Sequence, residues 1–259
     1  MMEKQTALKA ENLILGYGGR LILKDLDFSV RQGEIFGILG NSGCGKSTLL
    51  KHLTGIYPPV QGDIFLLGEK LDTSAPAAYR HLMTRIGVTY QGGALFSSMT
   101  VAENVALPLE LHTKKSKKEI AAIVREKLEL VDLADFGDFM PGELSGGMRK
   151  RAGLARAIAL DPKLLFFDEP SAGLDPLAAA GLDELILSMR ELLGVTVVVV
   201  THELDSIFTI TDRVIIIDKA EKTIVAEGDP RKLKDGSPNQ FVRDFLNRKG
   251  LKRSFTPNE

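Results

Sequence analysis

The 259-residue sequence has little of several features, and each shortage excludes a class of protein. It holds one cysteine, so no disulfide can form within the chain, and a reducing cytosol suits it. The longest apolar run, 195–201, has the length of a strand, far from the roughly 20 residues that cross a bilayer. The first six residues, MMEKQT, lack the charged-then-apolar layout of a secretory signal. We therefore expect neither a membrane span nor a signal peptide.

A surplus of either charge is also missing. The chain has 33 Lys and Arg against 34 Asp and Glu, for a net charge of −1. This balance gives no electrostatic argument for a nucleic-acid partner. With 44% apolar and 26% charged residues, the composition is that of an ordinary globular protein. The length predicts one large α/β domain, with or without a subdomain.

What the sequence does have is a glycine-rich stretch between an apolar run, 35–39, and a segment of helical character, 49–53. The context of strand, glycine-rich turn and helix is that of a phosphate-binding loop, whose N–H groups and helix dipole attract an anion. In such a loop Lys46 reaches the β- and γ-phosphates and Ser47 ligates Mg²⁺. The chain is predicted to bind a nucleoside triphosphate through Gly40, Asn41, Ser42, Gly43, Cys44, Gly45, Lys46, Ser47 and Thr48.

A second anion-attracting helix start follows about a hundred residues later. Ser145 is a natural N-cap, and Gly146 and Gly147 leave the first-turn N–H groups open. One triphosphate does not need two such sites in one domain. The second site is therefore predicted to serve a nucleotide held by another copy of the protein.

Two adjacent carboxylates end a run of four apolar residues, 164–167. Such a run predicts a strand buried on both faces, and side chains alternate along a strand, so Asp168 and Glu169 should point to different sides. Asp168 is predicted to join the Mg²⁺ shell and Glu169 to face the attacking water. Asp175 follows in a tight segment, 171–175.

Polar residues follow other predicted strands and turns. Gln91 ends the strand 85–90, where it can touch metal or water, because α/β sheets bind ligands at that edge. His202 ends the strand 195–201 and either meets the γ-phosphate or the water, or has a structural role. Tyr17, on a turn, either stacks on an adenine ring or packs locally.

The remaining segments predict the surroundings of this site. Residues 7–30 should form an antiparallel sheet that flanks the parallel core, and residues 95–160 should be helical. The basic run 114–118 is either a solvated helix entry or a contact for lipid headgroups or acidic loops. An apolar stripe at 241–246 should pack on its own domain or on a partner, and 252–259 should be frayed.

Taken together and in this order, the motifs resemble those of the nucleotide-binding subunits of ATP-binding-cassette (ABC) transporters, over nearly the full length. The resemblance implies a P-loop α/β fold with a mixed, largely parallel core sheet, an antiparallel β subdomain and a helical subdomain at about 92–160. It places this ATPase domain at 6–235 and a C-terminal helical extension and tail at 236–259.

The resemblance also implies a head-to-tail dimer that sandwiches two ATP molecules with Mg²⁺. Each ATP would lie between the phosphate loop of one subunit and, from the other subunit, Leu144, Ser145, Gly146, Gly147 and Asp175. Met148 stands where the family usually carries glutamine, so the backbone donors and Ser145 are what remains of that motif.

Individual roles follow by the same analogy. Tyr17 becomes the adenine-stacking residue, with Ile22 as an apolar neighbour. Glu169 becomes the general base, and His202, the family's switch histidine, and Gln91 are the other catalytic residues. Gln91 links the metal to the membrane partner and joins Ser47 and Asp168 as a metal ligand.

Among subfamilies, the chain looks like the ATPase of the lipid-asymmetry (Mla, or toluene-tolerance) transporters, in the stretches 90–96, 141–148 and 155–160. That resemblance implies phospholipid as cargo and a place on the cytoplasmic face of the inner membrane. It implies as partners an integral-membrane permease, a periplasmic MCE-domain lipid-binding protein and a small STAS-domain protein.

Several other functions compete with this one. The chain could serve an ABC importer or exporter of another solute, or be a regulatory nucleotide-binding module. DNA-repair and chromosome-organising ATPases of the same type carry long coiled-coil insertions, but only 122 positions separate Lys46 from Asp168. Translation factors of this type carry two cassettes, and this sequence has one.

Overall fold

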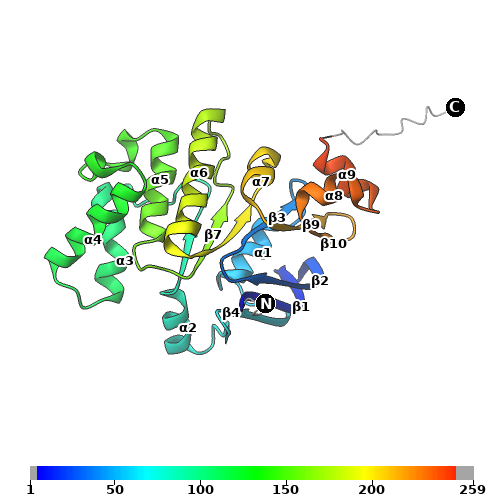
Figure 1. The fold of residues 1–259 in the computed structure, drawn as a ribbon. Coiled ribbons are helices and arrows are strands. Elements are labelled where there is room, and N and C mark those ends of the chain that lie inside the picture. The colour runs from blue at the N-terminus through cyan, green and yellow to red at the C-terminus, as the bar shows by residue number, and fades with distance from the viewer. Residues whose placement is uncertain (1–4, 249–259) are drawn as a thin grey trace.

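The computed structural model describes residues 5–248, in which two sheets are surrounded by helices (Figure 1). The smaller sheet is antiparallel, with strand order β2-β1-β4-β5, as predicted for the N-terminal region. A turn at Gly18 and Gly19, both with positive φ, joins its two long strands. Its strands are β1 (Thr6–Tyr17), β2 (Arg20–Arg31), β4 (Gln61–Leu66) and β5 (Glu69–Lys70).

The larger sheet has the order β10-β9-β3-β8-β7-β6, and its strands are parallel except for β10. The apolar runs of the sequence form its centre, where β3, β8 and most of β7 are fully buried. The strands are β3 (Ile35–Gly40), β6 (Ile86–Thr89), β7 (Leu164–Asp168), β8 (Thr196–Val200), β9 (Arg213–Asp218) and β10 (Thr223–Gly228).

Helices pack on both faces of this sheet, and further helices lie beyond it at each end of the molecule. Figure 1 shows α3, α4 and α5 gathered at one end of the molecule, away from α8 and α9 at the other. A capping box of Ser116 and Glu119 begins α4. The helices at the sheet are α1 (Lys46–Leu53), α2 (Pro76–Met83), α6 (Pro176–Leu193) and α7 (Leu204–Ile210). Those at the two ends are α3 (Val101–His112), α4 (Lys117–Leu130), α5 (Gly146–Ala157), α8 (Pro230–Gly236) and α9 (Gln240–Leu246).

The C-terminal helix α9 packs on its own chain. Val242 and Leu246 are buried in a cluster with Leu39 of β3 and Val214 and Ile216 of β9. This packing confirms the first of the two alternatives for the apolar stripe. The predicted fraying of 252–259 lies outside the described residues. Within 5–248, no helix combines the length and the apolar character needed to cross a membrane.

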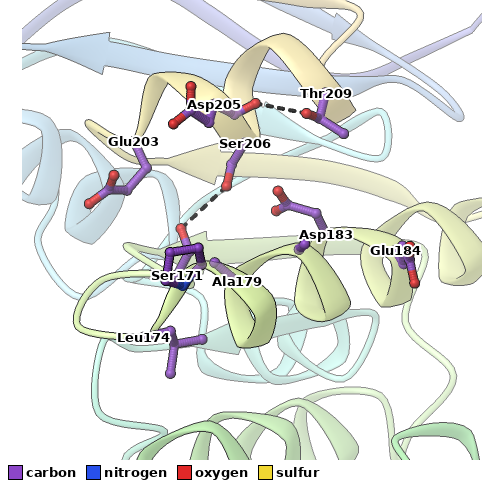
Figure 2. Close-up of a pocket in the computed structure, with 11 residues that line it drawn as sticks. Ser171, Leu174, Ala179, Asp183, Glu184, Glu203, Asp205, Ser206 and Thr209 are labelled. Atoms are coloured by element: carbon purple, nitrogen blue, oxygen red, sulfur yellow. Dashed lines mark hydrogen bonds between the residues drawn. The ribbon is translucent and has the colours of Figure 1, made fainter.

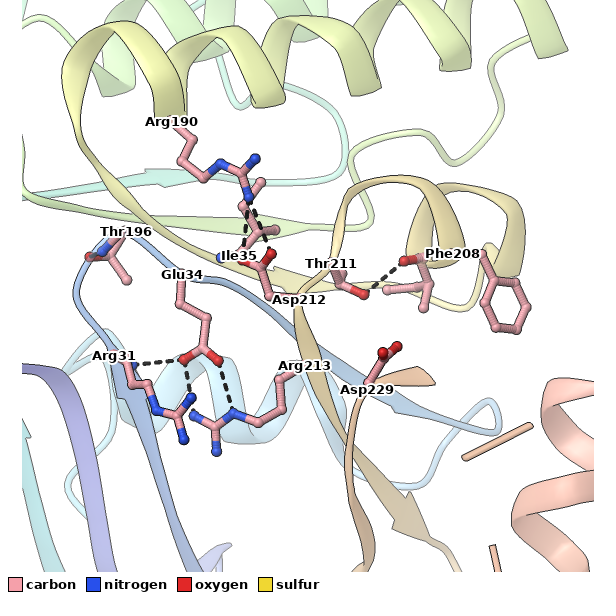
Figure 3. A network of polar contacts seen from close by, with 12 residues as sticks. Arg31, Glu34, Ile35, Arg190, Thr196, Phe208, Thr211, Asp212, Arg213 and Asp229 are labelled. Atoms are coloured by element: carbon pink, nitrogen blue, oxygen red, sulfur yellow. Dashed lines mark hydrogen bonds and ion pairs between the residues drawn. The ribbon is translucent and has the colours of Figure 1, made fainter. Parts of the chain in front are cut away.

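A buried ion pair fastens the two sheets to each other (Figure 3). Arg213 Nε of β9 donates to Glu34 Oε1 at 2.8 Å, and its Nη2 donates to the Ser29 carbonyl of β2 at 2.6 Å. The Arg213 guanidinium also lies over the Phe36 ring, 4.9 Å from its centroid. The hydrogen bonds that Arg213 donates to the Glu34 carboxylate raise the pKa of Arg213, so the guanidinium stays charged.

Candidate nucleotide-binding and catalytic site

The phosphate loop and four of the predicted polar residues lie at one edge of the larger sheet. Strands β3, β8, β7 and β6 are neighbours and run parallel, so their carboxyl ends lie side by side. The glycine-rich loop follows β3, His202 follows β8, Asp168 ends β7 with Glu169 directly after it, and Gln91 follows β6. This is the edge at which open α/β sheets bind ligands.

The glycine-rich loop has a backbone that only glycines fit. Gly40 and Gly45 have φ of 150° and 112°, and a Cβ on Gly40 would lie 2.5 Å from the Ile217 carbonyl oxygen. A Cβ on Gly45 would approach Ile22, which therefore lies against the loop. Helix α1 begins with Gly45 as N-cap and without a side-chain cap. Its first-turn N–H groups, which have no intrahelical partner, are thus left for a ligand.

Lys46 is folded over this loop. Its side chain is largely buried, and Nζ donates to the Gly40 carbonyl at 2.8 Å. Cys44 packs beneath the loop, where burial raises the pKa of its thiol, so only its backbone can face a phosphate. Ser42 and Ser47 of this loop are exposed, and Asn41 and Thr48 are half-buried.

Asp168 has the surroundings of a metal ligand. Its Oδ1 is buried and has no hydrogen-bond partner among the described residues. Burial and the neighbouring Glu169 raise the pKa of Asp168, while Lys51, Lys46 and a hydrogen bond with Ser47 act in the opposite direction. A carboxylate with an orphaned oxygen beside a hydroxyl fits Mg²⁺, which binds one or two carboxylates together with substrate phosphates.

Glu169 points to a different partner. Its carboxylate is 13% exposed and meets His202, whose Nδ1 lies 2.9 Å from Oε1 and whose backbone N–H donates to Oε2 at 3.3 Å. The backbone of Glu169 has φ of 49°, a left-handed conformation that is uncommon for a residue with a side chain. The two carboxylates thus face the phosphate loop and the histidine respectively. The contact between His202 and Glu169 was not among the alternatives drawn from the sequence.

Two exposed aromatic rings lie against each other, one at the end of β1 and one after the end of α1. Tyr17 is 61% exposed, and its ring stacks on that of Tyr57 with centroids 6.2 Å apart and planes 20° from parallel. Tyr57 was not predicted from the sequence. The feature that could have indicated it is an aromatic residue in the turn after α1. The pair offers a flat face on which a base can stack.

The second anion-attracting helix start has the predicted cap. Ser145 Oγ accepts a hydrogen bond from the Met148 N–H, Gly146 is exposed, and Gly147 is half-buried in the first turn of α5. Leu144 is buried, and the Met148 side chain packs against the apolar cluster around α5. Figure 1 places α5 apart from α1, so one chain does not bring the two helix starts together.

Asp175 caps a third helix. Its Oδ1 accepts a hydrogen bond from the Ala178 N–H at 2.9 Å, at the start of α6, and its side chain is exposed. Gln91 is exposed two residues beyond the end of β6, the strand that pairs with β7.

An acidic cavity that the sequence did not predict lies between α6 and α7 (Figure 2). It has a volume of about 330 Å³ and adjoins the 171–175 segment. Asp183 is 6% exposed, has an unpartnered Oδ1 among the described residues, and has a pKa raised by burial. The other carboxylates around this cavity are Glu184, Glu203 and Asp205.

The comparison with protein families matches residues 23–172, more than half of the chain, to the family described as ABC transporter. The chain belongs to the ABC transporter family. The family and the predicted class of enzyme, an ATPase, are thereby confirmed. The fold of this ABC transporter ATPase is similar to that of a Clostridium perfringens component of the cbiONQ ABC transporter complex. The TM-score is 0.81 with 29% identity, over 95% of this chain and 94% of the other.

A second solved structure is a dimeric ATP-binding cassette in a post-hydrolysis state with ADP and Pi. It matches this ABC transporter ATPase with a TM-score of 0.77 and 28% identity, over 86% of this chain and 98% of the other. These similarities confirm the ABC-type fold predicted from the motifs.

Curated relatives are more similar in sequence. The chain is 41% identical to the MlaF protein of Escherichia coli K12, an intermembrane phospholipid transport system ATP-binding protein, over 88% of this chain and 84% of the relative. It is also 41% identical to a probable ribonucleotide transport ATP-binding protein, mkl, of Mycobacterium leprae, over 95% of this chain. The chain spans 70% of the length of that mycobacterial protein.

Proposed function

We propose that this ABC transporter ATPase hydrolyses ATP at the edge of its larger sheet to drive phospholipid transport between bacterial membranes. The observation that carries the proposal is the placement of Asp168 and Glu169, one facing the phosphate loop and the other held by His202. Phospholipid is preferred as cargo because the MlaF proteins of two bacteria are 40–41% identical over 84–86% of their length.

The phosphate loop holds the triphosphate. Its N–H groups and the start of α1 bind the phosphates, and Lys46 exchanges the Gly40 carbonyl for the terminal phosphates. Ser47 and Asp168, with Gln91 nearby, hold Mg²⁺, which neutralises phosphate charge. Tyr17 stacks on the adenine, and Ile22 packs against the loop at Gly45.

Glu169 acts as the general base. Its carboxylate accepts the proton of the water that attacks the γ-phosphate, and His202 holds it in position through the two contacts described above. The demand on the protein is mostly positioning and charge stabilisation. A base fixed by a neighbouring imidazole meets that demand.

The second half of each site comes from a second copy of the chain. The helix start at Ser145 attracts an anion but lies apart from the phosphate loop of its own chain. In a head-to-tail dimer it binds the ATP of the partner, together with Leu144, Gly146, Gly147 and Asp175. A solved structure similar to this chain is a dimeric cassette.

The remaining partners are those implied by the resemblance of the motifs to the lipid-asymmetry transporters, and the similarity to MlaF supports that choice of subfamily. The ATPase lies on the cytoplasmic face of the inner membrane and transmits dimer closure through the region 92–112 to an integral-membrane permease. A periplasmic MCE-domain lipid-binding protein and a small STAS-domain protein complete the assembly. No nucleic acid takes part.

The test uses the complex purified from its native membrane with a tag on this chain. Placed in vesicles, it should transfer labelled phospholipid to acceptor vesicles with ATP and not with ADP. Labelled ribonucleotide in a parallel arm tests the cargo named for the mycobacterial relative. Transfer of ribonucleotide without lipid would refute the proposed cargo.

The matched control for chemistry is Glu169→Gln, which should lower kcat by about 1,000-fold, within the range for a general base, and leave ATP binding intact. A kcat near that of the wild type would refute the assignment of Glu169, whatever the cargo.

A further inference from the structure

Helix α5 touches two of the loops that carry site residues. A Cβ on Gly153 would lie 2.8 Å from the Gly93 Cα, so the α5 backbone packs directly against the loop that contains Gln91. Arg156 donates to the Gly93 and Ala94 carbonyls of the same loop, at 3.1 and 2.8 Å. The loop and the helix are thus fixed to each other.

Lys150, on the same helix, holds the chain that follows Glu169. Its Nζ donates to the Pro170 and Ala172 carbonyls, both at 2.6 Å, and lies 3.4 Å from the Glu169 carbonyl. An ammonium has three N–H donors, so three carbonyls use all of them. The Ala172 N–H also donates to the Glu169 carbonyl, which closes the turn around the ammonium.

The surroundings of Lys150 make these hydrogen bonds strong. Its side chain is partly buried beside Leu154, Phe167 and Leu182. Burial lowers the pKa of Lys150, and the Glu169 carboxylate counteracts part of that effect. Hydrogen bonds to a charged donor are about twice as strong as neutral ones, and carbonyls left without a donor in such a place are costly.

The segment that Lys150 holds needs support. Glu169 has a left-handed backbone, and such residues persist only where the surrounding structure over-determines them. The three carbonyls bound by Lys150 begin with that of Glu169 itself. An ammonium at this point fixes the direction in which the Glu169 side chain leaves the backbone.

We propose that Lys150 is a positioning residue for hydrolysis, which ties Glu169 to the helix that meets the nucleotide of the partner subunit. This inference rests on the proposed dimeric ATPase. Ser145 caps the start of α5, and Lys150 lies five residues further along the same helix. When the partner's ATP docks on Ser145, a rigid α5 carries the displacement to the base of its own chain. ATP held by one subunit thereby adjusts catalysis in the other.

The experiment compares three variants in the complex purified with its membrane partners. Lys150→Met keeps a long straight side chain but removes every donor, Lys150→Gln retains neutral donors, and Lys150→Arg retains charged ones. A base misplaced by about 1 Å costs on the order of 100-fold. We therefore expect kcat to fall by about 30- to 100-fold in Lys150→Met, least in Lys150→Arg, and to an intermediate value in Lys150→Gln.

The dissociation constant for ATP, measured by equilibrium binding, should stay within about twofold of the wild type, because Lys150 does not touch the phosphate loop. Arg151→Met is the control. Arg151 is the next residue of the same helix, and its guanidinium bonds to Val131 and Asp132 instead of the site. Its kcat should remain within about twofold of the wild type.

The proposal is overturned if Lys150→Met keeps the wild-type kcat, if the ranking Arg, Gln, Met is absent, or if Arg151→Met loses as much. Loss of ATP binding in step with kcat would show a structural role instead. If Glu169→Gln is inactive while Lys150→Met is fully active, this inference fails alone. If both are fully active, the proposed function fails with it.

Discussion

The two helix starts that attract anions are built differently. Helix α1 has a glycine N-cap in a left-handed conformation, no side-chain cap, and a buried lysine folded across its loop. Helix α5 has a serine N-cap whose hydroxyl is already bonded to the Met148 N–H. The basic residue nearest to that start, Arg149, is engaged with the Leu144 carbonyl.

This difference separates a complete phosphate site from half of one. The start of α1 combines open N–H groups, a lysine, and a hydroxyl next to an orphaned carboxylate oxygen. The start of α5 offers N–H groups on an exposed surface and lacks the other components. A site of the second kind gains affinity only when another molecule brings the phosphate together with its charge-neutralising groups.

The largest expected effects come from disabling each helix start separately. Lys46→Ala should weaken ATP binding and lower the ATPase rate by about 100-fold, because charge-assisted bonds to phosphate are lost. Ser145→Arg should lower the rate by a similar factor, about 100-fold, because the new side chain takes the place of the partner's phosphate at the start of α5, yet its own phosphate loop should bind ATP as the wild type does. Equilibrium binding and steady-state ATPase assays separate the two outcomes. A Ser145→Arg monomer that hydrolyses ATP at the full rate would contradict the view that the start of α5 is half of each site.

Mixing the two inactive proteins, Lys46→Ala and Ser145→Arg, tests whether the two helix starts of one site come from different chains. A mixed dimer has one site with both defects and one site with neither, because the intact phosphate loop and the intact Ser145 come from different chains. Equal amounts should recover up to about a quarter of the wild-type rate, since half of the dimers are mixed and each has one sound site. A mixture no more active than its components would contradict the head-to-tail arrangement.

A smaller effect is expected at the stacked aromatic rings of Tyr17 and Tyr57. Tyr17→Ala should raise the KM for ATP by about tenfold, the value of one base stacked on an aromatic ring, and leave kcat unchanged. Tyr17→Phe should behave as the wild type, because the ring and not the hydroxyl stacks. An equal rise in KM in both variants would argue against stacking.

The smallest effect concerns stability. Ser145→Ala removes the side-chain cap of α5 and should lower the free energy of unfolding by about 1 kcal/mol. Ser145→Asn, which can cap equally well, should restore it. Denaturant titration without nucleotide measures both, and an uncapped variant as stable as the wild type would show that the Met148 N–H has another partner.

Sequence patterns predicted the parts of the site that depend on local chemistry. Glycines at positive φ, a lysine at the helix start and two carboxylates at the end of an apolar strand are all read from neighbouring residues. The order of motifs then indicated the ABC family.

Contacts between distant segments were not predictable in this way. The bond of His202 to Glu169 spans 33 positions, and that of Lys150 to Ala172 spans 22. The stacking of Tyr17 on Tyr57 and the acidic cavity at Asp183 likewise depend on how strands and helices pack. Alternation along a strand gives the direction of a side chain but not the partner that it meets.

The Arg213 ion pair has a consequence for motion. Because this guanidinium holds Glu34 and the Ser29 carbonyl together, the antiparallel sheet and the strand before the phosphate loop should travel as one block. The distance between the ring of Tyr17 and the amine of Lys46 should then stay constant through the catalytic cycle. We expect hinge bending between this block and helices α3, α4 and α5. Such bending would move Ser145, at the start of α5, relative to the phosphate loop.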